Sequence, residues 1–277
     1  MSKAFQLRGC NAIITGASSG LGAEFARQIS PKAATLVLAA RSGDVLNDLA
    51  AELQKQNFSL RVVTCACDLA TGNGRAALWK CVEDAGIKPT LLINNAGVGD
   101  YGDFADADEA RIMLQINLNI TALTLMTREF VGRVSATAER PAAVLNISSL
   151  ASVAPMAQIG VYAATKAYVS SLGESLRIEL AARHVNVLTV CPGPTPTNFG
   201  SNALRPDGAD IVRTGQGFLR MPRGKVVSVA LQKLEDNAAR VFPGWRVTLA
   251  AMLFEKMPRV VLRMAFSLRY RQAERKS

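Results

Sequence analysis

Short runs of apolar and β-branched residues alternate along the chain with longer segments whose apolar residues recur at helical spacing. Near-continuous apolar runs are typical of parallel strands, which helices cover on both faces. Right-handed crossovers between such strands produce a doubly wound sheet. We therefore expect an α/β fold with a Rossmann-type parallel sheet flanked by helices. The expected strands are 10–15, 35–40, 60–66, 90–95, 142–148 and 185–191.

The regular alternation stops after residue 191. From Pro192 to about Gly224 the chain is rich in Gly, Pro, Asn and Asp. A connection of this length is typical of a functional lid, so we expect a substrate lid over about residues 194–225. At 277 residues the chain fits one large domain, which we place at 1–245, followed by a C-terminal extension at 246–277.

Cysteine and histidine usage argues against a metal protein. The five cysteines are odd in number and lie mostly in apolar runs, which is typical of reduced thiols in a cytoplasmic protein. The single histidine, His184, precedes an expected strand and is predicted to be structural, so no metal site is expected. The N-terminal segment MSKAFQLRGC lacks the apolar stretch of a secretory signal, and no run of about 18 apolar residues predicts a membrane span.

Most of the net charge lies in the extension. The formal charge is +10, and from Arg240 onward nine Lys and Arg face only two Glu, a net charge of +7. The same segment has two apolar stretches, 247–254 and 260–268. They would pack on the lid or a second subunit, or form a basic amphipathic surface against anionic lipid. The concentrated charge favours peripheral association with a membrane or a protein partner.

A glycine-rich loop follows the first expected strand and opens a helix, with the sequence TGASSGLG at residues 15–22. Gly16, Gly20 and Gly22 allow a tight turn and a close approach of the backbone to a diphosphate. The start of the next helix offers free N–H groups and the positive end of its dipole. This position in a parallel α/β pattern predicts a dinucleotide site that also includes Ser18, Ser19 and Leu21.

The second expected strand ends in two alanines and is followed by Arg41 and Ser42. An NAD site would place Asp or Glu near this point to accept hydrogen bonds from the ribose hydroxyls. A guanidinium instead suits a 2′-phosphate, which it can bind through two hydrogen bonds. The predicted cofactor is therefore NADP(H).

Tyr162 and Lys166 lie four residues apart in the helical segment 160–172, and therefore on one helix face. Taken alone, the pair is a common coincidence of two amphipathic side chains. In a poorly hydrated cleft, however, the ammonium and an oxidised nicotinamide would lower the pKa of the phenol by Coulomb attraction. Bringing that pKa near neutrality takes about 4 kcal/mol of preferential stabilisation of the phenolate.

Taken together and in this order, these motifs resemble the short-chain dehydrogenase/reductase family over roughly residues 8–245. The nearest resemblance is to ketoreductases with an arginine after the second strand and a C-terminal extension. It implies hydride transfer between a nicotinamide and a carbonyl or secondary alcohol. The other motifs of the set are Asp68-Leu69, Asn94-Asn95-Ala96-Gly97, Asn117, Ser149 and Pro192-Gly193.

The resemblance implies that Tyr162 is the acid and base, and that Lys166 tunes it and holds the nicotinamide ribose. It further implies that Ser149 hydrogen-bonds the substrate carbonyl. Ser149 is favoured over Ser148 because it lies 13 residues before Tyr162 and neighbouring side chains of an extended segment point to opposite sides. The fourth member would be Asn117, which would hold a water that links Lys166 to solvent.

Several roles have a competing assignment. Asn119 competes with Asn117, and the local pattern favours Asn117. Asp68 would bind the adenine amino group, with a turn-forming role as the alternative. Thr195 and Thr197 compete to reach the carboxamide or the diphosphate.

The resemblance also implies the rest of the cofactor groove. Asn94, Ala96 and Gly97 would shape it, Asn95 would brace the central strand beside it, and Pro192-Gly193 would begin the turn beneath the nicotinamide. The complete predicted cofactor-binding set is Gly16, Ser18, Ser19, Gly20, Leu21, Gly22, Arg41, Ser42, Asp68, Leu69, Asn95, Ala96, Gly97, Tyr162, Lys166, Pro192, Gly193, Thr195 and Thr197.

Two classes of function fit these motifs. One is an NADP(H)-dependent carbonyl reductase, and the other is a cofactor-binding scaffold or regulator; the complete set of catalytic residues favours the enzyme, with a homo-oligomer as its expected state. Nucleic-acid binding is not expected, because the basic extension lacks an aromatic platform or reader motif. The lid predicts a hydrophobic or lipid-like substrate, and its arginines allow an acidic handle such as a phosphopantetheine carrier. The apolar lid residues are Phe199, Leu204, Ile211, Phe218, Leu219 and Met221, and the arginines are Arg205, Arg213, Arg220 and Arg223.

Overall fold

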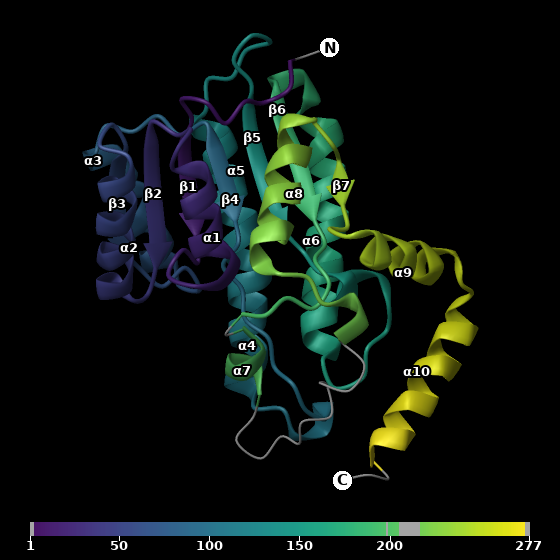
Figure 1. Ribbon diagram of the computed structural model, residues 1–277. Coiled ribbons are helices and arrows are strands. Elements are labelled where there is room, and N and C mark those ends of the chain that lie inside the picture. Colours follow the sequence, from purple (N-terminus) through teal and green to yellow (C-terminus); the bar gives the residue numbers. More distant parts are fainter. Residues whose placement is uncertain (1–2, 198, 205–216, 275–277) are drawn as a thin grey trace.

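A parallel sheet forms the centre of the computed structural model, which describes residues 3–197, 199–204 and 217–274 (Figure 1). In these residues the sheet has seven strands in the order β3-β2-β1-β4-β5-β6-β7. The order reverses direction between β1 and β4, which confirms the doubly wound, Rossmann-type sheet. The strands are β1 (Asn11–Thr15), β2 (Thr35–Ala40), β3 (Arg61–Ala66), β4 (Leu91–Asn94), β5 (Ala142–Ile147), β6 (Val185–Val190) and β7 (Arg240–Val241).

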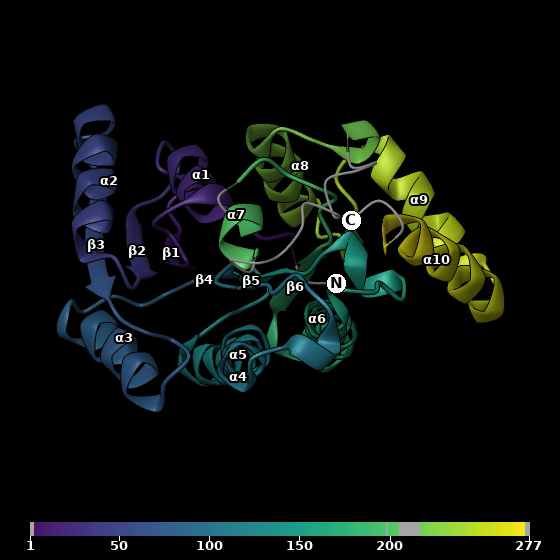
Figure 2. The same ribbon diagram turned by 90° about the horizontal axis from the view of Figure 1, so that it is seen from below.

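Helices cover both faces of the sheet, as seen along the strands in Figure 2. On one face a core cluster joins the sheet to α1 (Gly20–Ile29), α2 (Gly43–Gln56) and α8 (Arg223–Glu235). On the other face a second cluster joins it to α3 (Gly72–Asp84) and α5 (Leu123–Arg133), beside α4 (Glu109–Ile116) and α6 (Gly160–Glu179). Every residue of β5 and β6 is buried, because both faces of these strands are covered.

Short helical turns connect these elements. They are η1 (Phe104–Asp106), the π-helical turn η2 (Asn117–Ala122), η3 (Leu150–Val153), η4 (Ala181–Arg183) and, in the described parts of the expected lid, α7 (Phe199–Ala203) and η6 (Gly217–Leu219). His184 lies between η4 and β6, in the turn where the sequence places it, with φ of 54°. The edge strand β7 was not among the expected strands, because only two of its residues pair with β6.

Both apolar stretches of the extension are helical, α9 (Trp245–Lys256) and α10 (Arg259–Glu274). The inner face of α9 buries Val247 and Ala251 against Leu150 and Val153 of η3. α10 then turns back along the molecule toward the end of the sheet where the strands stop (Figure 1).

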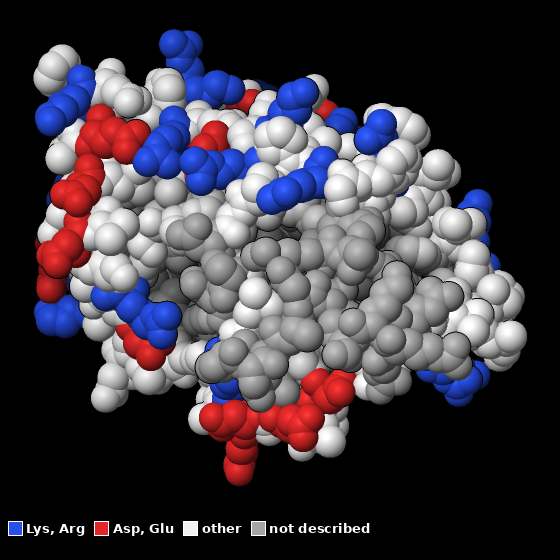
Figure 3. Space-filling view, turned by 60° about the horizontal axis from the view of Figure 1, so that its bottom comes forward, with Lys and Arg blue, Asp and Glu red and all other residues white. Residues whose placement is uncertain are grey.

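The outward faces of α9 and α10 are apolar and exposed. Along α9 and α10 these side chains are between 46 and 70 % exposed: Trp245, Leu249, Met252, Leu253, Val260, Val261, Met264 and Leu268. None of the described helices has the length and apolar character that a membrane crossing requires. Figure 3 shows Lys and Arg side chains along one margin of the face at the strand ends and acidic side chains along the opposite margin.

Candidate active site

The glycine loop lies at the carboxyl end of β1, and its shape lets other groups approach its backbone closely. Gly16 and Gly20 have φ of 65° and 58°, which a residue with a Cβ rarely adopts. A Cβ on Gly22 would collide with the carbonyl oxygen of Gly16, so the loop and α1 pack backbone against backbone. The Asn95 amide locks this shape by donating to the carbonyl oxygens of Thr15 at 2.9 Å and Gly16 at 3.1 Å.

Polar groups face the space over this loop. Ser19 precedes α1 and makes no side-chain capping bond, so N–H groups of the first helical turn have no hydroxyl or carboxylate cap. Ser18 and Leu21 are half-buried beside it. A Cβ on Gly20 would lie 3.4 Å from the Thr197 side chain, whereas Thr195 donates to the carbonyl oxygen of Gly193 at 3.1 Å. Of the two threonines, Thr197 is therefore the one beside the glycine loop.

The end of β2 carries a cation with no counter-charge. Arg41 is exposed, and it forms no ion pair with any described carboxylate. Ser42 precedes α2 and makes no side-chain capping bond. Arg41, Ser42 and the first turn of α2 therefore offer several hydrogen-bond donors to an anion at this point.

Asp68 and Leu69 follow β3. The Oδ1 atom of Asp68 accepts a hydrogen bond from the Ala70 N–H at 3.0 Å, so the turn-forming role is present in the structure. The Leu69 side chain is buried in the core, which leaves only its backbone to face a ligand. Binding of adenine by Asp68 stays a prediction.

The expected role of Asn94 in the groove is wrong. Its side chain is buried and donates to Thr127 Oγ1 at 2.8 Å and to Asn146 Oδ1 at 2.9 Å. It therefore ties β4 to β5 and α5 rather than facing the cofactor groove. The reason is strand alternation, since Asn94 and Asn95 point to opposite sides.

The two serines after β5 point in opposite directions, as alternation predicts. Ser148 is buried and donates to the carbonyl oxygen of Lys166 at 2.8 Å, beside Ser170. Ser149 lies on the other side, where its hydroxyl accepts a hydrogen bond from the Ala151 N–H at 3.1 Å and also hydrogen-bonds Tyr162. The structure therefore brings Ser149, and not Ser148, to Tyr162.

Tyr162 and Lys166 lie together on α6. The ammonium nitrogen of Lys166 is 5.6 Å from the centre of the Tyr162 ring and donates to the carbonyl oxygen of Ile147 at 2.9 Å. Burial lowers the pKa of Lys166 to about 8. Burial also raises the pKa of Tyr162, and the hydrogen bond from Ser149 offsets only part of that effect.

The expected lowering of the Tyr162 pKa depends on an oxidised nicotinamide as well as on Lys166, so it stays a prediction for the protein with bound cofactor. In the protein alone desolvation is the larger effect. Tyr162 is therefore a neutral phenol that has a proton to donate.

Asn119, and not Asn117, reaches the Tyr162 and Lys166 site. The Asn119 side chain is buried, donates to Thr165 Oγ1 at 3.0 Å and bonds both the N–H and the carbonyl of Val98. A Cβ on Gly97 would lie 3.1 Å from Asn119 Oδ1 and 3.3 Å from Lys166 Nζ, so both side chains meet at the Gly97 backbone.

Asn117 is half-buried and has no side-chain hydrogen bond to a described residue. The π-helical turn η2 begins at this residue and shifts the rotation of the helix, which sequence reasoning cannot detect. The sequence does offer one signal for Asn119, because it is the second asparagine of the segment QINLNIT.

Phe199 covers Tyr162. In the described part of the expected lid, the ring centres of Phe199 and Tyr162 are 5.2 Å apart at an angle of 49°. Leu204 forms a bridge with Tyr101 beside them. Ile211, Arg205 and Arg213 lie outside the described residues.

The turn after β6 is held by the extension. The carbonyl oxygen of Pro192 accepts a hydrogen bond from the Leu150 N–H at 2.8 Å, which ties the turn to the residue after Ser149. A Cβ on Gly193 would lie 2.8 Å from a methyl group of Val247, so α9 packs directly beneath this turn.

Among the described residues no group of His, Cys, Asp and Glu could hold a metal ion, and all five cysteines are free thiols. The glycine loop, the donors at Arg41 and the group formed by Ser149, Tyr162 and Lys166 all lie where parallel strands end. These features define the class of α/β oxidoreductases with a dinucleotide site.

The chain belongs to the short-chain dehydrogenase/reductase family, because the model of the short chain dehydrogenase family matches residues 10–207. It is 35% identical over 197 residues to sepiapterin reductase from Rattus norvegicus, which covers 68% of this chain and 74% of that protein. It is 33% identical over 183 residues to very-long-chain 3-oxoacyl-CoA reductase from Podospora anserina, which covers 65% of this chain and 53% of that protein. A short-chain dehydrogenase from Sphingobium yanoikuyae, solved in complex with NADPH, has a TM-score of 0.72 and 30% identity over 90% of this chain and 97% of that one.

Proposed function

We propose that the protein is an NADP(H)-dependent oxidoreductase that transfers a hydride between nicotinamide and a carbonyl or secondary alcohol. The observation that carries the proposal is the meeting of Ser149, Tyr162 and Lys166 at the carboxyl end of the sheet. In the favoured direction it reduces a hydrophobic or lipid-like ketone.

The bound cofactor would supply the hydride, and the protein supplies the proton. Tyr162, kept neutral by burial, donates its proton to the oxygen of the reduced carbonyl. The Ser149 hydroxyl donates to the same oxygen while negative charge develops on it. The ammonium of Lys166 stabilises the phenolate that remains on Tyr162.

Asn119 is proposed as a positioning residue in place of Asn117. It holds the Val98 backbone to Thr165, and Thr165 lies next to Lys166 on α6. Its oxygen and the Lys166 ammonium meet the same face of Gly97. Removing this amide would loosen the position of the lysine relative to the cofactor groove.

The glycine loop fits a diphosphate because a Cβ would fill the space at Gly20, below Thr197, and would clash within the loop at Gly22. Arg41 and Ser42 would bind a 2′-phosphate, and this is the basis for proposing NADP(H) over NAD(H). The complex of the Sphingobium yanoikuyae relative with NADPH supports this choice.

The apolar substrate is proposed from the aromatic wall that Phe199 forms over Tyr162. The similarity to very-long-chain 3-oxoacyl-CoA reductase supports a ketone on an apolar chain. The competing proposal is a cofactor-binding scaffold that retains the fold without turnover.

The test is a screen of ketones of increasing chain length, with NADPH consumption followed by its absorbance. We expect the wild type to consume NADPH with an apolar ketone and Tyr162→Phe to bind NADPH without consuming it. Binding of NADPH with no turnover of any ketone by the wild type would favour the scaffold.

We also propose residues 1–245 as the catalytic unit and 246–277 as an extension that contacts a membrane surface or a second subunit. The proposed setting is the cytoplasm, with peripheral contact at the membrane. The support is the exposed apolar face of α9 and α10 together with the net charge of +7 from Arg240 onward. A vesicle flotation assay and the mass of the protein in solution test these two contacts.

A further inference from the structure

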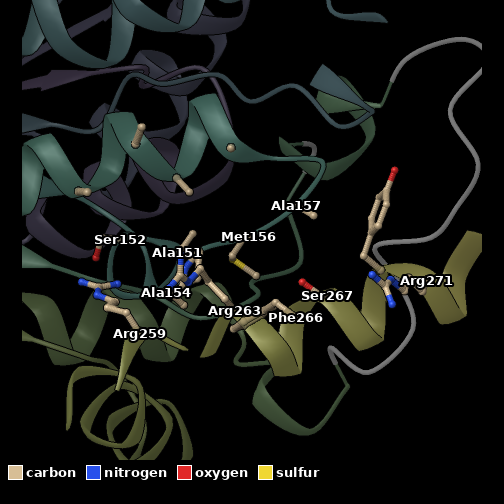
Figure 4. A pocket seen from close by; sticks show the side chains of 16 residues that line it. Ala151, Ser152, Ala154, Met156, Ala157, Arg259, Arg263, Phe266, Ser267 and Arg271 are labelled. Atoms are coloured by element: carbon tan, nitrogen blue, oxygen red, sulfur yellow. The ribbon is translucent and has the colours of Figure 1, made fainter. Parts of the chain in front are cut away.

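An open cavity lies between the extension and the catalytic unit. α10 lies across from the first half of α6, and a cavity of about 740 Å³ lies between the two helices (Figure 4). Cavities that bind small-molecule ligands measure about 300–1,000 Å³. The α6 wall is made of small residues, Gly160, Ala163, Ala164 and Ala167, so their side chains leave the space open.

The opposite wall is cationic. Arg259, Arg263 and Arg271 line the cavity from α10, and Figure 4 shows Arg259 and Arg263 pointing toward the loop around Ala151 and Ala154. Neither Arg259 nor Arg263 forms an ion pair with a described carboxylate. Two guanidinium groups beside an apolar wall, without a counter-charge, favour an anion with planar or tetrahedral oxygen geometry.

The orientation of α10 is fixed by contacts to the rest of the chain. Leu262 is buried, and the ring of Phe266 packs edge-on against the ring of Phe254, with 5.9 Å between the two ring centres. The Tyr270 hydroxyl donates a hydrogen bond to Asp103 Oδ1 at 3.0 Å. These contacts place Arg259 and Arg263 at the rim of the cavity, where both residues are also exposed to solvent. They leave Met264, which does not line the cavity, 62% exposed.

Leu262 and Phe266 give α10 an apolar side that packs on the rest of the chain, and Arg259 and Arg263 each lie three residues before one of them, next to that side of the helix. The cavity between α10 and α6 is therefore apolar with a cationic rim.

The cavity also shares a wall with the candidate active site. Ala163 follows Tyr162 on α6, and Ala151 lies two residues after Ser149; both line the cavity. Met156, another lining residue, packs in one apolar cluster with Tyr162. A ligand in the cavity would therefore lie against the back of the residues that hold the phenol.

We propose that this cavity binds an anionic amphiphile, with its phosphate or carboxylate on Arg259 and Arg263 and its apolar chain against the alanines of α6. The proposal rests on the proposed function only where the bound amphiphile changes turnover at Tyr162, through Met156, which lines the cavity and packs with Tyr162. Binding itself requires no turnover, so the two can be tested apart.

The first experiment measures binding by calorimetry of the full-length protein with octyl phosphate, octanol and inorganic phosphate. We expect octyl phosphate to bind most tightly, because it supplies both the anion and the chain. In Arg259→Gln/Arg263→Gln the affinity should fall about ten-fold or more, as for the loss of charge-assisted hydrogen bonds. Tyr162→Phe should bind octyl phosphate like the wild type.

Three variants serve as controls. Arg8→Gln/Arg61→Gln removes the same charge at exposed sites away from the cavity and should bind normally. Met264→Gln alters the outward face of α10 and should also bind normally. Ala164→Phe fills the cavity without changing its charge and should weaken binding of octyl phosphate and octanol alike.

Equal affinity of the wild type for octyl phosphate and octanol would overturn the proposal. So would a loss in Met264→Gln that exceeds the loss in the arginine variant, because the amphiphile would then lie on the outer face. If inorganic phosphate bound as tightly as octyl phosphate and lost the same affinity in the arginine variant, the cavity would bind an anion without using an apolar chain. The proposal of an amphiphile would then be overturned.

The second experiment connects the cavity to turnover. The reduction assay with an apolar ketone is run with and without octyl phosphate. We expect octyl phosphate to change kcat/KM of the wild type, and the arginine variant to lose this effect while its rate without octyl phosphate is unchanged. Binding of octyl phosphate without any effect on kcat/KM would leave a binding site that is not coupled to turnover, and that part of the proposal would be wrong.

Discussion

The ammonium nitrogen of Lys166 lies 5.6 Å from the centre of the Tyr162 ring, and both groups are held by α6 beside β5. Lys166 donates to the Ile147 carbonyl at 2.9 Å, so its position is set by the sheet as well as by its own helix. Burial raises the pKa of the phenol and lowers the pKa of the ammonium. Both shifts follow from the loss of water, and they give the site a proton donor beside a cation that titrates near neutral pH.

Tyr162→Phe is expected to lower kcat at least about ten-fold, which corresponds to ~1.4 kcal/mol or more of transition-state stabilisation. Only the hydroxyl is removed, and the ring keeps its contact with Phe199. NADPH binding, measured by its fluorescence, should be unchanged. A variant that retains more than about a tenth of the wild-type kcat would contradict the acid and base role.

The rate of reduction should fall as pH rises through about 8, the pKa of Lys166 in the unliganded protein. Above this pH the lysine is neutral and no longer stabilises the phenolate that forms on Tyr162. The measurement is the pH profile of kcat/KM, which reports groups of the free enzyme. In Lys166→Arg the fall should move to higher pH, because a guanidinium stays protonated. An unchanged profile in this variant would assign the titration to another group.

The same pKa shift predicts a dependence of stability on pH. Between about 8 and the ordinary lysine pKa of about 10.4, the unfolded chain binds a proton that folded Lys166 has released. The lysine contribution to the free energy of unfolding therefore rises with pH in this window. Denaturant unfolding of the wild type and Lys166→Met at several pH values should show this rise in their difference, and a constant difference would contradict it.

Arg41→Ala should weaken NADPH binding by about 1–3 kcal/mol, as for the loss of hydrogen bonds to a charged group. NADH binding should change much less, because Arg41 forms no ion pair with a described residue and would contact only the 2′-phosphate. The two dissociation constants are measured by cofactor fluorescence. Equal losses of affinity for NADPH and NADH would show that Arg41 contacts the diphosphate or stabilises the fold.

Asn119→Ala should lower kcat and the melting temperature together, because the amide bonds both the N–H and the carbonyl of Val98. Loss of a buried hydrogen-bonding group costs about 1–3 kcal/mol. Asn117→Ala is the matched control and should change both quantities little. To separate position from stability, the pH profile of Asn119→Ala is compared with that of the wild type. A larger loss of kcat in Asn117→Ala would restore the original assignment.

The exposed face of α10 predicts binding to anionic vesicles at low salt. Val260→Ser/Met264→Ser/Leu268→Ser should abolish flotation with such vesicles, because these side chains are exposed and apolar. Phe58→Ser/Ile178→Ser removes two exposed apolar side chains elsewhere and should float normally. If the wild type does not float at low salt, the extension is a packing element or a subunit contact.

The extension is tested by point substitutions because deleting residues 246–277 would also remove α9. Val247 of α9 is buried beneath Gly193, at the turn that follows β6. A truncated protein would therefore lose activity through an opened core, whatever the extension binds.

Six of the strands, the glycine loop and the family are readable from the sequence, because each depends on local patterns. Apolar runs report burial on both faces of a sheet, and glycines report where a Cβ cannot fit. The opposed directions of Ser148 and Ser149 follow in the same way from strand alternation. The pairing of Tyr162 with Lys166 needs only the helical repeat.

Other features depended on the tertiary structure, because they arise between segments distant in the chain. The π-helical turn at Asn117 rotates Asn119 toward Thr165, which changes the asparagine that meets the site. The pKa of Tyr162 rises because the folded chain removes its water, and no local pattern reports solvent exclusion from several elements at once. The place of the α10 arginines beside the cavity was visible in the sequence only as charge, since the position of α10 is set by the contacts of Phe266 and Tyr270 with residues elsewhere in the chain.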